Sequence, residues 1–165
     1  MRTPFNDLPT TKKGDIGERL FTEYLSQNGF VVYSPPLAGR HPVDRIVYHP
    51  KRGWLAVDVK TYPRRYCCLD TGIDQADYLK YQKLPLRVLL CFVDEFEGCI
   101  YVAYLDELKP TGEPSGGKVY FPLGAFKKVR PLTPAELAEL DELSPYAKGE
   151  RYRHQRRYFA APKPA

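Results

Sequence analysis

The sequence predicts a single α/β domain built around a mixed sheet of about five strands. Three observations support this fold class. Apolar residues recur at helical spacing over residues 11–28, two strand-like segments flank a turn at residues 49–53, and residues 86–93 form a nearly continuous apolar run. The last pattern is typical of a central strand that is covered on both faces. The length of 165 residues fits one compact domain.

The first helix is expected over residues 11–28. Ile16, Leu20 and Tyr24 follow one another at intervals of four residues, and Gly29 ends the helix. A short strand over residues 30–33 is expected next.

A β-hairpin follows this strand. Residues 43–48 and 54–60 are strand-like, and the turn-forming residues 49–53 join them. The later expected elements are, in chain order, a loop over residues 62–72, a helix over 74–83, strands over 86–93 and 99–105, a loop over 109–118 and a short edge strand over 119–121.

A further helix begins at Thr133. Thr133 suits the N-cap, Pro134 the first helical position and Glu136 the third, which together form a capping box. Both an interface with another chain and a cover for the core fit this helix.

The net charge of +5 is concentrated at the C-terminus. Residues 145–165 contain six lysines and arginines against one glutamate, so residues 1–144 are neutral overall. Aromatic residues are interleaved with the basic ones, a pattern suited to phosphate contacts and base stacking; a solvated chain end is the alternative. We therefore expect one domain over residues 1–144, with an extra strand and helix over 118–144, followed by a basic aromatic tail over 145–165.

The sequence also excludes several classes of protein. No stretch approaches the roughly 18 apolar residues of a membrane span, and the N-terminal residues lack the apolar core of a signal peptide. We therefore expect a cytoplasmic protein whose four cysteines are thiols. The cysteines lack the spacing of a structural zinc site, and Cys91, in an apolar run, is expected to be buried.

Two carboxylates and one lysine converge on the predicted hairpin. Asp44 and Asp58 are symmetric about residue 51 in the turn, so they are expected opposite each other on one face. Lys60 is two residues beyond Asp58 and projects from the same face. Paired carboxylates suit Mg²⁺, with Mn²⁺ able to substitute, and a lysine beside them can stabilise charge on a phosphate. The grouping indicates metal-dependent hydrolysis of a phosphodiester.

A third acid lies on the first predicted helix. Glu18 precedes Phe21 by three residues and Leu25 by seven, so it borders the sheet-facing side of the helix. A carboxylate in that position is costly without a partner. Gly17 allows close packing around it.

The order of these residues resembles the PD-(D/E)XK nuclease superfamily. Glu18 lies on a helix, Asp44 on a strand, and Asp58 and Lys60 on the next strand. Pro42-x-Asp44 stands for the Pro-Asp element of the superfamily, with one residue intervening. Asp58-x-Lys60 matches its (D/E)-x-K element, with aspartate in place of the commoner glutamate.

The first helix carries a further resemblance. Residues 13–18, Lys-Gly-Asp-Ile-Gly-Glu, are similar to the first helix of archaeal Holliday-junction resolvases. The resemblance covers about residues 12–105 and implies a restriction-endonuclease-like αβββαβ core, to which the C-terminal helix and basic tail are additions.

The resemblance implies a Mg²⁺-dependent endonuclease acting on DNA, of the structure-specific or the restriction and defence type. Asp44 and Asp58 would bind the metal, Glu18 would complete the metal shell or orient its water, and Lys60 would position the nucleophile. Four residues are auxiliary candidates from the resemblance: Thr61, Gln75, Tyr78 and Gln82. Basic residues beside the site and in the tail are the candidate nucleic-acid contacts: Arg64, Arg65, Lys148, Arg151, Arg153, Arg156 and Arg157.

Other readings of the same residues remain open. Asp44 fits a strand-start residue that binds a backbone amide, and Asp58 and Lys60 fit a surface ion pair worth about 0–1 kcal/mol. A catalytically inactive nucleic-acid-binding module of the same fold and an RNA nuclease are the alternative functions. A homodimer fits the two cuts that a duplex requires.

Overall fold

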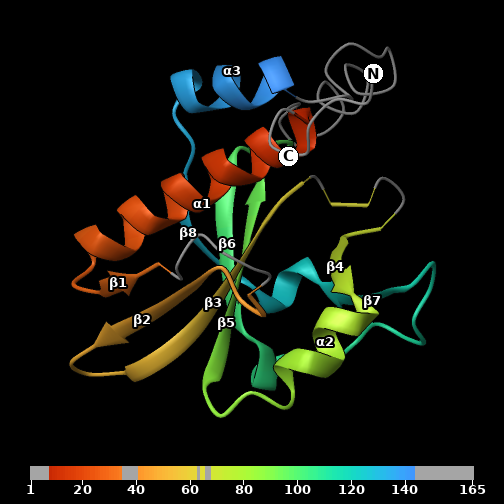
Figure 1. Ribbon diagram of the computed structural model, residues 1–165. Helices are drawn as coiled ribbons and strands as arrows, with labels where there is room; N and C mark the ends of the chain where they lie inside the picture. Colours follow the sequence, from red (N-terminus) through yellow and green to blue (C-terminus); the bar gives the residue numbers. More distant parts are fainter. Residues whose placement is uncertain (1–7, 35–40, 63, 66–67, 144–165) are drawn as a thin grey trace, which may run out of the picture.

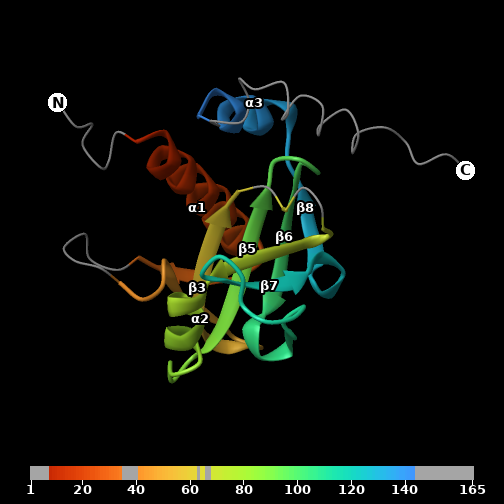
Figure 2. The same ribbon diagram turned by 90° about the vertical axis from the view of Figure 1, so that its right-hand side faces the viewer.

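The structure, a computed structural model, describes residues 8–34, 41–62, 64–65 and 68–143. Over these residues the chain forms three layers, seen in Figures 1 and 2. A six-stranded sheet in the order β1-β2-β3-β5-β6-β8 forms the middle layer. Helices α1 and α3 pack on one face of this sheet, and α2 with the two-stranded sheet β4-β7 packs on the other.

The helices and strands have the following bounds. The helices are α1 (Pro9–Gln27), α2 (Gln75–Tyr81) and α3 (Pro134–Leu143). The strands of the large sheet are β1 (Val31–Tyr33), β2 (Arg45–His49), β3 (Gly53–Thr61), β5 (Arg87–Asp94), β6 (Cys99–Tyr104) and β8 (Lys127–Pro131). The small sheet consists of β4 (Asp70–Asp74) and β7 (Lys118–Pro122).

One parallel pair organises the large sheet. β3 and β5 run parallel, whereas the other neighbouring strands of the sheet run antiparallel. Parallel neighbours need a crossover connection, and here the crossover carries β4 and α2. The crossover therefore places α2 beside β3, the strand that carries the predicted (D/E)-x-K element.

Side chains of β3 alternate between the two faces of the sheet. Val57 and Val59 belong to the apolar cluster under α1, and Ala56 belongs to the cluster under α2. Residues of β5 contribute to both clusters, and after Arg87 the whole strand is buried. The prediction of a central strand covered on both faces is confirmed.

Helix α1 packs closely on the end of β3. Leu20, Phe21 and Leu25 are at most 1% exposed against the sheet. A Cβ placed on Gly17 would lie 1.8 Å from Oγ1 of Thr61, so glycine permits this approach of helix to strand. The expectation that Gly17 allows close packing is confirmed.

Helix α3 has the predicted capping box. The backbone N–H of Thr133 donates to Glu136 Oε2 at 2.8 Å, and the N–H of Glu136 donates to Thr133 Oγ1 at 3.3 Å. Leu140 is fully buried, and Arg19 of α1 pairs with Glu139 at 2.6 Å. The helix therefore covers the core beside α1.

Two expectations about the sheets were wrong. Residues 70–72 are not loop but the start of β4. The short edge strand expected over 119–121 is present as β7, and it pairs with β4 in a separate small sheet. β8 was not expected at all, so the large sheet has six strands. β8 is rich in lysine, arginine and proline, which suits an edge strand but gives little apolar signal.

Two smaller expectations concern burial and membrane association. Cys91 is fully buried, as predicted, and Cys91 and Cys99 are thiols, as expected. No helix in the described part of the chain combines the length and the apolar character needed to cross a membrane.

Candidate active site

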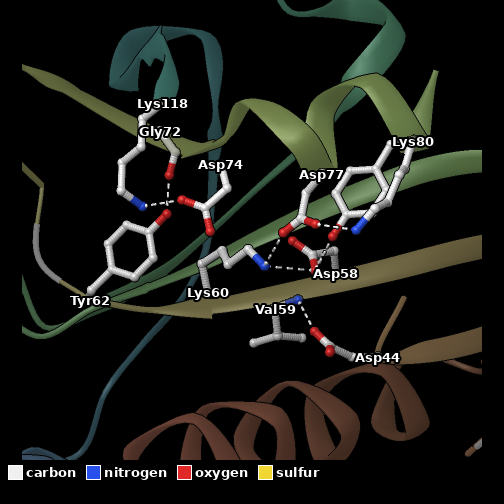
Figure 3. Close-up of polar contacts among 11 residues, drawn as sticks. Asp44, Asp58, Val59, Lys60, Tyr62, Gly72, Asp74, Asp77, Lys80 and Lys118 are labelled. Atoms are coloured by element: carbon white, nitrogen blue, oxygen red, sulfur yellow. Dashed lines mark hydrogen bonds and ion pairs between the residues drawn. The ribbon is translucent and has the colours of Figure 1, made fainter. Parts of the chain in front are cut away.

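Strand β3 presents Asp58 and Lys60 on the face toward α2 (Figure 3). The two residues are one strand repeat apart, so their side chains project in the same direction. Nζ of Lys60 lies 3.0 Å from Oδ1 of Asp58. Asp58 is only 2% exposed and Lys60 is half-buried, so this is a partly buried ion pair and not the surface pair that was the alternative interpretation.

Asp44 reaches the same region from the residue before β2. The register of the hairpin pairs Arg45 with Val57, which agrees with the predicted symmetry about residue 51. Oδ2 of Asp44 accepts a hydrogen bond from the backbone N–H of Val59 at 2.7 Å. Asp44 therefore binds a backbone amide, as the alternative interpretation of a strand-start residue expected. It also lies close enough to Asp58 for their charges to interact.

Burial perturbs both carboxyl groups, and the charge of Asp58 adds to the effect on Asp44. Burial, followed by the charge of Asp58, raises the pKa of Asp44 to about 7. Burial also raises the pKa of Asp58 against the opposing effects of Lys60 and Tyr81. A divalent cation would relieve the cost of holding two negative charges here.

A hydrogen bond from Tyr81 of α2, a residue that was not among the predicted site residues, holds Asp58 in place. The hydroxyl of Tyr81 donates to Oδ1 of Asp58 at 2.6 Å. Within the described part of the chain, Oδ2 of Asp58 is buried and has no hydrogen-bond partner. Lys60 and Tyr81 thus occupy one carboxylate oxygen and leave the other available to a ligand.

Lys60 has a second acidic neighbour on α2. Its Nζ lies 3.8 Å from Oδ2 of Asp77, which also pairs with Lys80 at 3.2 Å. Although burial opposes the charged form, the carboxylates, Asp58 first, raise the pKa of Lys60. Lys60 is therefore an ammonium ion at neutral pH.

A second group of contacts ties the small sheet to the end of β3 (Figure 3). The hydroxyl of Tyr62 donates to the carbonyl oxygen of Gly72, and Lys118 pairs with Asp74 at 2.9 Å. Nζ of Lys118 also lies 5.3 Å from the centre of the Tyr62 ring. These contacts fix β4, and with it the start of α2, relative to β3.

The auxiliary candidates of α2 lie on neighbouring faces of the helix. Gln75 and Gln82 are exposed, and Tyr78 packs on Phe121 with ring centres 5.9 Å apart. Asp77 and Tyr81, four residues apart, make the contacts to β3 instead. Their i, i+4 spacing places both on one face of α2, but the sequence alone does not indicate that this face meets β3.

Glu18 lies on α1 and is paired with Arg45. Oε2 of Glu18 is 2.8 Å from Nη1 of Arg45, so the half-buried carboxylate has the partner that its position requires. Burial, opposed by Arg45, raises the pKa of Glu18, and Asp58 adds to this rise. Thr61 lies on the α1 side of β3, where its hydroxyl is buried.

The basic candidates beside the site are engaged in ion pairs. Arg64 is 5% exposed and lies 3.1 Å from Glu97. Arg65 forms a two-point contact with Asp70, and its guanidinium lies 3.6 Å from the centre of the Tyr120 ring. The five basic tail candidates, Lys148, Arg151, Arg153, Arg156 and Arg157, lie outside the described residues.

The donor set fits a divalent cation of the Mg²⁺ type. Among the described residues no group of three His, Cys, Asp or Glu side chains is close enough to hold a metal ion. Mg²⁺, however, is commonly held by one or two carboxylates together with waters and substrate phosphate. The unpartnered buried oxygen of Asp58 and the adjacent carboxylate of Asp44 supply such a pair.

Comparison with known proteins supports the fold. No protein-family model matches the sequence, and no curated protein matches it. Among solved structures, the chain is similar to Hjc, a Holliday junction resolvase from the archaeal hyperthermophile Archaeoglobus fulgidus, with a TM-score of 0.50 and 14% sequence identity. The match covers 68% of this chain and 91% of Hjc. The chain therefore has the restriction-endonuclease-like fold, as its resemblance to the PD-(D/E)XK nucleases implied.

Proposed function

We propose that the protein is a metal-dependent endonuclease that hydrolyses phosphodiester bonds in DNA and prefers branched or otherwise irregular DNA. The observation that carries the proposal is the convergence of Asp44, Asp58 and Lys60 at one end of β3, in a fold shared with a Holliday junction resolvase. Oδ2 of Asp58, which is buried and has no hydrogen-bond partner among the described residues, adds to it, because leaving such an oxygen without a partner is costly.

Asp44 and Asp58 would hold Mg²⁺, or Mn²⁺ in its place. The bound ion would supply a water that is easier to deprotonate and would stabilise negative charge on the phosphate. Asp44 is oriented for this role by the amide of Val59, and Asp58 by Lys60 and Tyr81. Held in this way, the two carboxylates are preorganised before substrate arrives.

Lys60 would bind the scissile phosphate or the attacking water as a cation. Its raised pKa keeps the ammonium charged at neutral pH, which suits stabilisation of developing negative charge better than proton abstraction. Glu18 on α1 would help to position the hairpin that carries Asp44, because it forms an ion pair with Arg45 of that hairpin.

The preference for irregular DNA rests on the fold and on the charge of the chain. Hjc is a Holliday junction resolvase. The tail over residues 145–165 would add affinity for the phosphate backbone that depends on salt and little on sequence. A homodimer would allow two symmetric cuts in one duplex or junction.

Cleavage assays test the proposal. Labelled plasmid, linear duplex, four-way junction and single-stranded DNA are incubated with Mg²⁺, Mn²⁺ or EDTA. The proteins compared are the wild type, Asp58→Asn, Lys60→Ala and, as a matched control, Asp106→Asn, which changes an exposed acid paired with Arg87. We expect metal-dependent cutting by the wild type and the control, and a loss of at least about a hundredfold in both site variants.

Two other outcomes would point to the alternatives. DNA binding that ignores Mg²⁺ and survives Asp58→Asn, without any cutting, would identify a binding module. Cutting of a matched RNA in preference to every DNA would identify an RNA nuclease, because the same carboxylate pair can serve either substrate.

A further inference from the structure

The face of the large sheet that carries Asp58 and Lys60 extends beyond α2 onto β1 and β2. The registers place Val31 beside Tyr48 and Tyr48 beside Trp54 on this face. Tyr33, two residues along β1 from Val31, projects from the same face. In Figure 1, β1 and the β2–β3 turn lie at the left of the molecule and α2 lies at the lower right.

Three aromatic rings form a connected group on this part of the sheet. The ring centres of Tyr33 and Trp54 are 5.4 Å apart, and those of Tyr48 and Trp54 are 5.2 Å apart. Tyr33 and Trp54 are 49% and 50% exposed, and Tyr48 is half-buried beneath them. We call Tyr33, Tyr48 and Trp54 the aromatic platform.

The aromatic platform lies on the same face of β3 as the candidate active site, with the buried Ala56 between Trp54 and Asp58. Trp54 and Asp58 lie on the same strand and the same face, four residues apart, which corresponds to about 13 Å along β3. This spacing is on the scale of a few nucleotides of a DNA strand. A strand with its scissile phosphate at Asp58 therefore has neighbouring bases within reach of Trp54.

The surroundings of the platform suit a nucleic acid. The turn that joins β2 to β3 at the edge of the platform carries Lys51, which is exposed. Arg52 of the same turn faces the opposite side of the sheet, where its Nη1 lies 3.3 Å from the hydroxyl of Tyr104 and its guanidinium lies 5.9 Å from the centre of the Phe30 ring. Exposed aromatic rings with a cation at their edge match the stacking surface and backbone contacts of proteins that bind single strands.

We propose that the aromatic platform stacks unpaired bases of the substrate, so that the preferred substrate carries a single-stranded or unstacked segment beside the scissile phosphate. This inference rests on the proposed function, whose site it deepens. Bases inside a regular duplex are stacked on one another and are not available to Trp54, whereas every unpaired base presents a free ring face. The platform thus selects for DNA with an unpaired segment.

Trp54 provides a direct probe because it is the single tryptophan of the chain. Intrinsic fluorescence of Asp58→Asn, which retains the platform, is followed in EDTA while single-stranded oligothymidylate or a blunt duplex of the same length is added. We expect saturable quenching by the single strand and little quenching by the duplex at equal nucleotide concentration.

Substitutions that remove a ring test whether single-strand binding depends on base stacking. Trp54→Ala and Tyr33→Ala are each expected to weaken binding of the single strand about tenfold, measured by fluorescence anisotropy of labelled DNA. Trp54→Phe keeps a ring and should restore most of the affinity. Leu79→Ala is the matched control, because Leu79 is equally exposed at 49% but carries no ring.

The outcomes separate this inference from the proposed function. Metal-dependent cleavage by the wild type, with equal quenching by both DNAs and no effect of Trp54→Ala, would overturn the platform and leave the nuclease intact. Selective single-strand binding that needs Trp54, with no cleavage of any DNA, would support the platform and refute the nuclease. Concentration-dependent self-association lost in Trp54→Ala, without a change in DNA binding, would show a second copy of the chain on this face and overturn the inference.

Discussion

The hydroxyl of Tyr81 on α2 donates to Oδ1 of Asp58 on β3 at 2.6 Å. This bond joins the crossover helix to the strand that carries the predicted (D/E)-x-K element. It also fills one oxygen of Asp58 and leaves Oδ2 buried without a hydrogen-bond partner among the described residues. The arrangement explains how a buried carboxylate can be held in place and still keep a ligand position.

Tyr81→Phe should weaken metal use without unfolding the protein. The ring keeps its packing, but Asp58 loses the bond that orients it. Loss of such a supporting contact typically costs about 10–100-fold in metal affinity or activity. Cleavage rates measured over a range of Mg²⁺ concentrations should shift to higher Mg²⁺. Tyr78→Phe is the control, since Tyr78 packs on Phe121, and an identical loss in both variants would contradict the assigned role of Tyr81.

Asp44→Asn tests whether the carboxylate pair is destabilising without metal. Burial, then Asp58, raises the pKa of Asp44 from 3.8 to about 7. Between about pH 4 and pH 7 the folded protein therefore binds more protons than the unfolded chain, and its free energy of unfolding falls as pH rises. In EDTA we expect Asp44→Asn to be more stable than the wild type at pH 8 by at least about 1 kcal/mol.

The control for this prediction is the same comparison at acid pH. At pH 4 the wild-type carboxyl is protonated in the folded state, so most of the gain should vanish. Urea unfolding at both pH values measures the difference. A gain that is the same at pH 4 and pH 8 would mean that the titration of Asp44 is not its cause.

Gly17→Ala should destabilise the fold by pushing α1 away from β3. The new methyl group would lie 1.8 Å from Oγ1 of Thr61, and relief of such overpacking typically costs about 1–3 kcal/mol. Gly14→Ala in the same helix meets no atom of the described residues within 4 Å and should stabilise by up to about 1 kcal/mol. Urea denaturation of the two variants measures both changes in the free energy of unfolding. An unchanged free energy of unfolding in Gly17→Ala would show that the helix can move freely.

Thr133→Ala should lower stability by about 1 kcal/mol, the usual cost of removing an N-cap side chain. The variant removes the acceptor for the N–H of Glu136 but leaves Arg130 paired with Glu136 at 2.8 Å. Because α3 packs on the face opposite Asp58, nuclease activity at low temperature should not change. A loss of activity larger than the loss of stability would indicate that α3 contributes to the site directly.

The core of the candidate site could be predicted because it depends on the symmetric pairing of residues in one hairpin. The turn at residues 49–53 determines the register of the hairpin, and the register brings Asp44 close to Asp58. Alternation along β3 then places Lys60 beside Asp58. No knowledge of distant parts of the chain is needed for these steps.

The contacts from α2 could not be predicted in the same way. Which face of α2 meets β3 depends on the crossover, and the crossover depends on β4 pairing with β7, about 48 residues further along the chain. The sequence analysis therefore named Gln75 and Tyr78 on this helix and did not name Asp77 and Tyr81, which contact β3.

Long-range pairing also governs the basic residues and the missed strands. Arg64 is buried because Glu97 on a distant turn neutralises it, which nothing in its own neighbourhood signals. β4 and β8 carry few apolar residues, so their strand conformation comes from their partners in the sheet and not from local propensity.

The most direct test of the account is the rate at which wild type and Asp58→Asn cleave a four-way junction as Mn²⁺ is increased from zero. We expect saturable, metal-dependent cutting by the wild type and none by Asp58→Asn, with junction binding retained in both. Equal cutting by the two proteins, or cutting that persists in EDTA, would contradict a metal-dependent nuclease centred on Asp44 and Asp58.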